Sequence, residues 1–283
     1  MKRFLSLFLA AAALLVLPAR AADGRAVIAA DLTEEQIGAV YADFGLERGS
    51  VPELTLTNAD ERALLAGLVP DEQIGTRSIS CVLVTPAEEE TTVRAENVDF
   101  CTESMYLAAC ATAGIEHAAI HVTAPFTVSG TAALAGIYMA YEDMTGQSLG
   151  AEEKRAGLLE LVTTGKLRDA LGSREANTLV TELKLILEKT RGMSDEELDK
   201  TIDDLAGSYK IPLNDTQREM LRSLCRGLEK LDGDKLHDQV EGVKRTLEKA
   251  GEFKDKAFSL WDALSAFFRA ISAFIARLFA IFR

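Results

Sequence analysis

The stretch Ala118–Gly136, AAIHVTAPFTVSGTAALAG, decides the fold class of the first half of the chain. Its first six residues are rich in β-branched side chains and predict a strand over Ala118–Thr123. The turn at Ser129–Thr131 and the small residues behind it predict a helix that runs through Tyr141. A strand that leads into a helix in this way is typical of a βαβ unit.

Upstream of this stretch lie two β-rich runs, and the second of them alternates between apolar and polar residues. Ser78–Thr85 and Thr92–Val98 are predicted strands, and the acidic Glu88–Glu90 between them is a plausible hairpin loop. A helix is predicted from Thr102 to Ala113, just before the Ala118 strand. We therefore expect a βαβ unit beside a β-hairpin.

The region before these strands also mixes helical and extended patterns. Thr33 is a predicted N-cap for a helix that ends near Phe44, and a short extended piece follows at Glu53–Thr57. A second helix is predicted to start at Asn58 and to end near Gly67. Residues 22–150 are therefore predicted to form a mixed α/β domain.

Strand signals disappear after residue 150, and apolar residues recur at helical spacing. The expected fold class is α+β, in which the mixed α/β head of residues 22–150 precedes an all-helical region of residues 151–251. The predicted helices of that region are Glu152–Thr163, Ser173–Arg191, Asp195–Tyr209, Asp215–Leu231 and Lys235–Gly251.

The first 21 residues have the pattern of a secretory signal peptide. Lys2 and Arg3 precede an apolar run, Phe4–Leu17, and Ala19–Ala21 is an A-x-A cleavage site. The run is short for a transmembrane anchor. We expect an exported, extracytoplasmic protein, secreted or peripheral on the outer face of the cell membrane.

The composition limits the partners and the chemistry. A formal net charge of −13 argues against nucleic acid, because phosphates would be repelled. The three histidines do not combine with cysteines at a zinc spacing, so neither a metal nor a cofactor is expected. Disulfides are permitted outside the cytoplasm, and a Cys81–Cys101 bridge is conceivable, but free buried thiols are favoured for Cys81, Cys101, Cys110 and Cys225.

Two loops are candidate sites. Backbone N–H groups at Ser129, Gly130 and Thr131 would bind a carboxylate or phosphate if they open a helix. The alternatives are a plain helix cap with close helix–sheet packing, and a nucleophilic Ser129, for which no base can be placed from the sequence. Arg77 would help to hold a polar ligand if it pairs with Asp60 or Glu61 near a cleft, and a structural ion pair is the other interpretation.

Three motifs carry a family resemblance. They are Leu56–Arg62 (LTNADER), Pro70–Ser80 (PDEQIGTRSIS) and Ala124–Gly136 (APFTVSGTAALAG). Over about residues 30–189 the chain resembles a family of secreted bacterial proteins of unknown function that includes YpuA. The resemblance implies export and a Gram-positive bacterial origin, and it supplies no reaction, cofactor or catalytic residue.

Residues 252–283 end the chain with an amphipathic helical pattern. On a helical projection the apolar side chains occupy one arc of roughly 100–160°. This pattern favours a helix that lies in the plane of a membrane, with its arginines beside anionic headgroups. The predicted membrane-binding residues are Trp261, Leu264, Phe267, Phe268, Arg269, Ile271, Phe274, Ile275, Arg277, Leu278, Phe279 and Phe282.

Other interpretations of this segment remain open. A membrane span would place Arg269 and Arg277 inside the bilayer, at a cost of about 2.5–3.5 kcal/mol each near its centre. Packing on the protein's own helices, contact with an envelope protein and self-association are further alternatives. The sequence favours a binding or structural module held at the membrane surface, and the alternative is a secreted hydrolase of envelope material with a site near Ser129 and Arg77.

Overall fold

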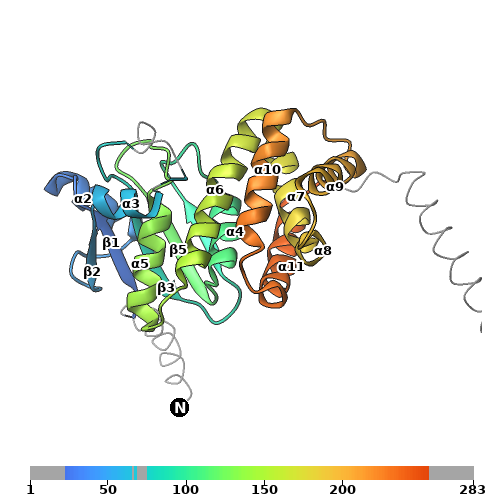
Figure 1. The fold of residues 1–283 in the computed structure, drawn as a ribbon. Coiled ribbons are helices and arrows are strands. Elements are labelled where there is room, and N and C mark those ends of the chain that lie inside the picture. Colours follow the sequence, from blue (N-terminus) through green and yellow to red (C-terminus); the bar gives the residue numbers. More distant parts are fainter. Residues whose placement is uncertain (1–22, 66, 69–74, 255–283) are drawn as a thin grey trace, which may run out of the picture.

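A computed structural model describes residues 23–65, 67–68 and 75–254 (Figure 1). The N-terminal part is built on one mixed five-stranded sheet in the order β2-β1-β3-β5-β4. The helical region follows it in the chain, so the α+β class is confirmed. The strands are β1 (Arg25–Ala29), β2 (Glu53–Leu56), β3 (Cys81–Pro86), β4 (Thr92–Ala95) and β5 (Ala118–Thr123).

Parallel crossovers build both ends of the sheet. β4, helix α4 (Glu103–Ala113) and β5 form the predicted βαβ unit, in which β4 and β5 pair in parallel. A second unit joins β1 to β2 through helix α2 (Glu34–Phe44). β3 is antiparallel to both of its neighbours, β1 and β5.

The predicted hairpin between β3 and β4 is wrong, because β5 lies between these two strands. β3 pairs with β5 from Cys81 opposite Thr123 to Pro86 opposite Ala118. Both strands are mostly buried, whereas β4 alternates between exposed and half-buried residues. The two apolar strands therefore pair in the middle of the sheet, and the more polar β4 takes the edge.

Most helix ends of the head match their local signals. Thr33 caps α2 in a capping box with Gln36, and Thr102 caps α4. Helix α3 (Asn58–Leu65) begins one residue after Thr57, whose hydroxyl accepts the Asp60 N–H. Helix α5 (Ala133–Thr145) begins later than the predicted start at Ser129.

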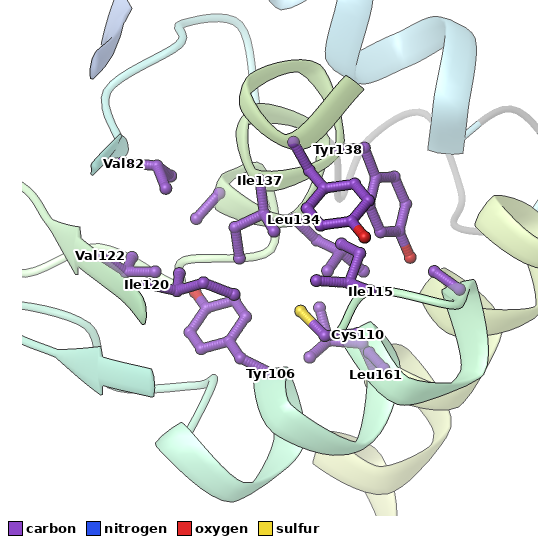
Figure 2. Packing of buried hydrophobic residues seen from close by; sticks show 14 of the residues in the cluster. Val82, Tyr106, Cys110, Ile115, Ile120, Val122, Leu134, Ile137, Tyr138 and Leu161 are labelled. Atoms are coloured by element: carbon purple, nitrogen blue, oxygen red, sulfur yellow. The ribbon is translucent and has the colours of Figure 1, made fainter. Parts of the chain in front are cut away.

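Helices cover both faces of the sheet. α2 packs Val40, Tyr41 and Phe44 on the face that carries Ala26 and Ile28. α4 and α5 pack on the opposite face, where Val27 and Val82 point. Figure 2 shows the second of these cores, in which Tyr106 and Cys110 of α4 meet Leu134 and Ile137 of α5.

The helical region is confirmed, with several changes of boundary. Helix α6 continues to Leu171, and the predicted Ser173–Arg191 helix is divided at Ile186. α6 lies between the sheet and the remaining helices in Figure 1, with Leu158 in the core of the head and Leu167 in the helical core. The helices are α6 (Ala151–Leu171), α7 (Ser173–Leu185), α8 (Leu187–Thr190), α9 (Asp195–Ser208), α10 (Asp215–Leu228) and α11 (Gly233–Ala250).

All four cysteines are free and buried, as favoured by the sequence. Cys81 lies in the core on the α2 side of the sheet, whereas Cys101 lies in the core on the α4 side. The sheet therefore separates the two thiols. Burial raises the pKa of both thiols to about 12, so they stay protonated at neutral pH.

Residues 1–22 and 255–283, with the predicted signal peptide and membrane-binding segment, lie outside the described residues. Within the described part of the chain, no helix has both the length and the apolar composition to span a membrane.

Candidate functional site

Both predicted site loops lie at one edge of the sheet, the edge formed by the carboxyl ends of its parallel strands. The strand pairings place the ends of β1, β2, β4 and β5 at the same edge as the start of β3. Arg77 precedes β3, and the Ser129–Thr131 loop follows β5. Ligands of open α/β sheets commonly bind outside the carboxyl ends of parallel strands, so this edge is the first candidate site.

The loop after β5 is held to the segment after β4 by backbone hydrogen bonds. Val128 N–H donates to Asn97 O over 3.0 Å, and Asp99 N–H donates to Val128 O over the same distance. Cys101 N–H donates to Ser129 O over 3.1 Å. These bonds extend the β4–β5 pairing past the sheet and fix the course of the loop.

Gly130 is the pivot of this loop. Its φ is +84°, and a Cβ atom there would approach Tyr106 Oη closely and lie 2.9 Å from Val98 Cγ1. Its carbonyl accepts a hydrogen bond of 2.6 Å from Tyr106 Oη. Gly130 therefore completes a turn packed against the core, and α5 begins only at Ala133 because the left-handed backbone at Gly130 cannot continue into a helix.

The side chains of Ser129 and Thr131 remain accessible to solvent on either side of Gly130. Ser129 is exposed, and its hydroxyl lies 3.4 Å from the Thr131 hydroxyl. Pairs of hydroxyls suit hydrogen bonding to a polar ligand. Among the described residues, none of the hydrogen bonds found for Ser129 Oγ involves a histidine or a carboxylate that would act as its base.

Arg77 contacts the end of β1 rather than α3. Its Nη2 donates to Asp31 O over 2.8 Å, and the Asp31 carboxylate accepts the Ser78 N–H over 2.7 Å. Among the described residues Arg77 makes no pair with Asp60 or Glu61, and Asp60 instead accepts hydrogen bonds from Thr57. Arg77 and Asp31 thus join the start of β3 to the end of β1.

Glu61 is a buried carboxyl at the same edge. It is 4% exposed, and neither Glu61 Oε1 nor the buried Ser78 Oγ makes a hydrogen bond of ordinary geometry to another described residue. Burial raises the pKa of Glu61, the nearby charges of Asp31 and Asp60 add to the rise, and the Ser78 and Asn58 side chains oppose it. The sequence indicated Glu61 only as a possible partner of Arg77, and its burial was not predicted.

The histidines near β5 do not join this edge as a catalytic base. His121 Nε2 lies 3.4 Å from Glu96 Oε2, and its ring packs edge-on against Phe44. Burial lowers the pKa of His121. His117 precedes β5, at the opposite edge, and its Nδ1 lies 2.9 Å from Glu89 O. No group of three or more His, Cys, Asp or Glu within residues 23–65, 67–68 and 75–254 is arranged to hold a metal ion.

Comparisons with known proteins agree on a family. A family described as "Protein of unknown function (DUF1002)" matches residues 28–245. The chain belongs to this family. It is 33% identical over 290 residues to "Uncharacterized protein YpuA" of Bacillus subtilis (strain 168), an alignment that covers 95% of this chain and 99% of that protein. No solved structure matches the chain.

Membership confirms the resemblance carried by the three motifs and assigns no activity. The structure explains why these motifs stand out. LTNADER joins β2 to α3, the end of PDEQIGTRSIS contains Arg77 and Ser78, and APFTVSGTAALAG contains the Gly130 turn. All three meet at the same edge of the sheet. The described parts of the three motifs that carry the resemblance therefore lie near the candidate site.

Proposed function

We propose that this protein is exported to the cell envelope and is held at the outer face of the membrane by its C-terminal segment, as a binding or structural module. The body of residues 23–254 would then present the sheet edge and the helical region to the envelope. The signal-peptide pattern of residues 1–21 supports export.

The surface of the body carries this proposal. Among the described residues, Phe126 is the single large apolar side chain that is exposed, at 45%. The described body therefore presents little exposed large apolar side chain against which the apolar arc predicted for Trp261–Phe282 would pack. Because a soluble protein rarely leaves a large apolar surface in water, a lipid surface is the best counterpart for this arc.

The body is also complete without the C-terminal segment. Its two largest hydrophobic clusters are formed by residues 27–162 and 156–253. Lys254 is the last described residue, and its N–H donates to Thr178 Oγ1 over 2.8 Å while its Nζ lies 3.1 Å from Glu175 Oε1. Phe253 packs edge-on against Tyr209. We therefore propose residues 255–283 as the segment that binds the membrane.

Charge supports an anionic membrane as the target. The formal net charge of the whole chain is −13, and 42 of its 44 acidic residues lie in residues 23–254, so the body by itself is repelled by anionic lipids. Arg269, Arg277 and Arg283 place positive charge beside the apolar arc. Each basic residue near an anionic surface contributes about 1 kcal/mol to binding.

The alternative, a secreted hydrolase, has less support. Ser129 is exposed, but its hydroxyl contacts Thr131 rather than a base. Arg77 is engaged by the Asp31 carbonyl. Neither contact places an acid and a base beside a nucleophile, so no observation favours this second candidate.

Co-sedimentation with vesicles that contain one quarter phosphatidylglycerol tests the proposal. The full chain should bind, and a chain stopped after Lys254 should stay in the supernatant. Stopping there, rather than at Gly251, keeps the packed Phe253 in place. Arg269→Glu with Arg277→Glu should weaken binding at least tenfold. Arg245→Glu with Lys249→Glu is the control, because it makes the same charge change on exposed positions of α11.

Equal binding by the full and shortened chains would exclude the C-terminal segment as the anchor. Export is measured separately. Protein recovered from outside the cytoplasm of a Gram-positive host should begin at Ala22, as read by N-terminal sequencing. Recovery of the whole chain in the cytoplasm with Met1 intact would overturn the export part.

A further inference from the structure

Strand β4 is an outer strand of the sheet. Its free side is a different place from the carboxyl-end edge that holds the candidate site. Within the described part of the chain β4 pairs only with β5, and Glu96 N–H donates to Val122 O over 2.9 Å on that side. Because the backbone groups of a strand alternate in direction, the N–H and C=O groups of Val93 and Ala95 point away from β5. Ala95 N–H donates to Glu103 Oε1 over 3.0 Å, whereas Val93 makes no such bond to a described residue.

A groove runs beside this edge, between β4 and helix α11, with α4 as its floor. It consists of two adjoining hollows of about 230 and 200 Å³ that share Thr91, Leu107 and Thr246. An enclosed cavity of about 150 Å³ holds a benzene molecule, so each hollow accommodates one branched or aromatic side chain. Helices α4 and α11 pack against each other, and in Figure 1 α11 lies beyond α4 as seen from β5.

The groove is apolar inside and acidic at its rim. Leu107, Ala111 and Val243 form the floor and wall, and Gly242 leaves space where other residues would place a side chain. The charged rim residues are Glu90, Glu103, Glu116, Asp238 and Glu252, with Arg245 as the cation on the same rim.

Neutral donors hold three of these acids. Glu116 Oε1 accepts from Gln239 Nε2 over 2.9 Å, and Glu252 Oε2 accepts from Asn177 Nδ2 over 3.1 Å. Glu103 accepts the backbone N–H of Ala95. These contacts leave the negative charges uncompensated, so the rim attracts a cationic partner.

We propose that this groove, lined by β4, α4 and α11, binds an extended polypeptide that pairs with β4 and carries alternating apolar and basic side chains. Backbone hydrogen bonds to Val93 would hold the peptide as a further strand. Its apolar side chains would enter the hollows over Leu107 and Ala111, and its basic side chains would face the acidic rim.

An extended partner fits this place better than the chain's own C-terminal segment. That segment has a helical period, and a helix cannot pair its backbone with a strand edge. The two hollows take single side chains rather than a continuous apolar arc. The inference concerns the body and does not require the membrane anchoring proposed above.

Fluorescence anisotropy with the full chain tests the proposal. The probe is a fluorescein-labelled octapeptide of alternating valine and lysine. Two comparison peptides are used. One alternates valine with glutamate, and the other is the valine–lysine peptide with every second backbone N–H methylated. The first should bind, with an affinity that falls at high salt. The other two should bind at least tenfold more weakly, since one reverses the charge and the other removes the strand pairing.

Two variants locate the binding. Val93→Pro removes the outward N–H and should weaken binding about three- to tenfold, the effect of one hydrogen bond. Thr55→Pro is its matched control, because Thr55 is an exposed position on the other edge strand, β2, beside neither hollow.

Gly242→Leu should abolish binding by filling the groove, and it replaces a helical glycine whose nearest neighbour to a new Cβ is Arg245 Nη2 at 3.8 Å. Since leucine favours a helix more than glycine does, this variant should fold at least as well as the parent.

The proposal is overturned if the valine–lysine peptide fails to bind at 1 mM, or if Gly242→Leu and Val93→Pro bind it as the parent does. Binding only by the chain stopped after Lys254 would assign the groove to the protein's own C-terminal segment. A dimer in sedimentation velocity that Val93→Pro dissociates would assign the edge to a second copy. Either result would replace the proposed partner.

Discussion

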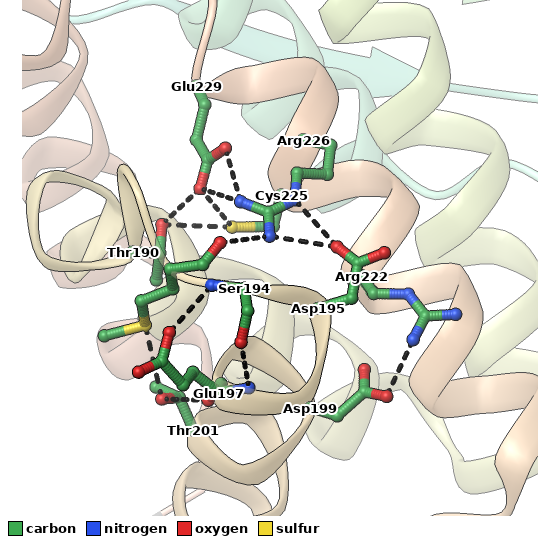
Figure 3. A network of polar contacts seen from close by, with 11 residues as sticks. Thr190, Ser194, Asp195, Glu197, Asp199, Thr201, Arg222, Cys225, Arg226 and Glu229 are labelled. Atoms are coloured by element: carbon green, nitrogen blue, oxygen red, sulfur yellow. Dashed lines mark hydrogen bonds and ion pairs between the residues drawn. The ribbon is translucent and has the colours of Figure 1, made fainter.

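The inner and outer sides of the helical region hold their charges differently. At the inner side, where α4, α6 and α7 meet, Lys184 Nζ lies 2.7 Å from Glu160 Oε1, and both side chains are 1% exposed. Thr112 Oγ1 donates to Glu160, and Lys184 Nζ donates to Ala108 O. At the outer side, Arg226 joins Asp195, Glu229 and the Met193 carbonyl while its side chain is 32% exposed (Figure 3).

The difference shows that the number of ionic contacts does not measure their effect. The outer network has more partners, but water screens it and replaces each lost contact. The inner pair has few partners, and loss of one partner leaves a charge without water. Three substitutions sharpen this comparison.

The largest effect is expected from Lys184→Met. The substitution leaves Glu160 buried without a cation, so the free energy of unfolding should fall by about 3–5 kcal/mol. Urea unfolding of the full chain measures it, and Arg226→Met in the outer network should cost about 1 kcal/mol or less. Replacing both Lys184 and Glu160 with apolar residues should recover much of the loss. A loss no larger than that of Arg226→Met would contradict the assignment of a dry interior.

A smaller effect is expected from Gly157→Ala in α6. The new Cβ would lie 2.6 Å from Ala109 O and 2.5 Å from Tyr138 Oη, so α6 and α4 would have to separate. Overpacking of this kind costs about 1–3 kcal/mol. Gly207 in α9 meets nothing within 4 Å, and Gly207→Ala should instead stabilise the protein by about 0.5–1 kcal/mol. Thermal unfolding measures the change in Tm of the two variants relative to the parent. A change in Tm of the same sign for both would show that α4 and α6 do not pack as described.

The smallest effect is expected on the pH dependence of stability, and it concerns a buried carboxyl group in the mixed α/β head rather than in the helical region. Burial raises the pKa of Glu61, so the folded protein keeps this proton to a higher pH than the unfolded chain does. The resulting stability is complete below the unfolded pKa of about 4.3 and is lost as the pH rises through the folded pKa. Glu61→Gln should therefore gain stability over the parent between pH 4 and pH 7. Glu219→Gln, on an exposed position of α10, is the control, and the same pH trend in both would refute a specific role for Glu61.

Local signals predicted the helices well. Thr33, Thr102 and Asn214 cap helices through their own side chains, and Gly45 and Gly114 end helices in the left-handed conformation. Such contacts lie within one turn of the chain, so the sequence contains both partners. The βαβ unit of β4, α4 and β5 was predicted for the same reason, since parallel strands that are close in sequence need a helical crossover.

Strand order was not predictable in this way. β3 and β4 are close in sequence, yet β5 lies between them, and β1 was not among the predicted strands. Which strands pair depends on how much apolar surface each can bury, and that is a property of the whole sheet. The start of α5 was misplaced because the pairing of Val98 with Val128 extends the preceding strand contact.

The candidate site was predicted in part. The sequence indicated the Ser129 loop and Arg77, and the structure places both at one edge of the sheet. It named Glu61 only as a possible partner of Arg77, and it indicated neither the burial of Glu61 and Ser78 nor the groove beside β4. Burial of Glu61 and exposure of the β4 edge arise from residues far apart in the chain, so no local pattern records them.

By itself, the sequence determined the helical segments, the α+β class, the family and the amphipathic pattern of residues 252–283, because each depends on periodicity or on residues within a few positions of one another. Only the tertiary structure decided the order of the strands, the separation of Cys81 from Cys101, the dry Lys184–Glu160 pair and the open groove at β4. Those features depend on which distant segments exclude water from each other, and that is set when the whole chain packs.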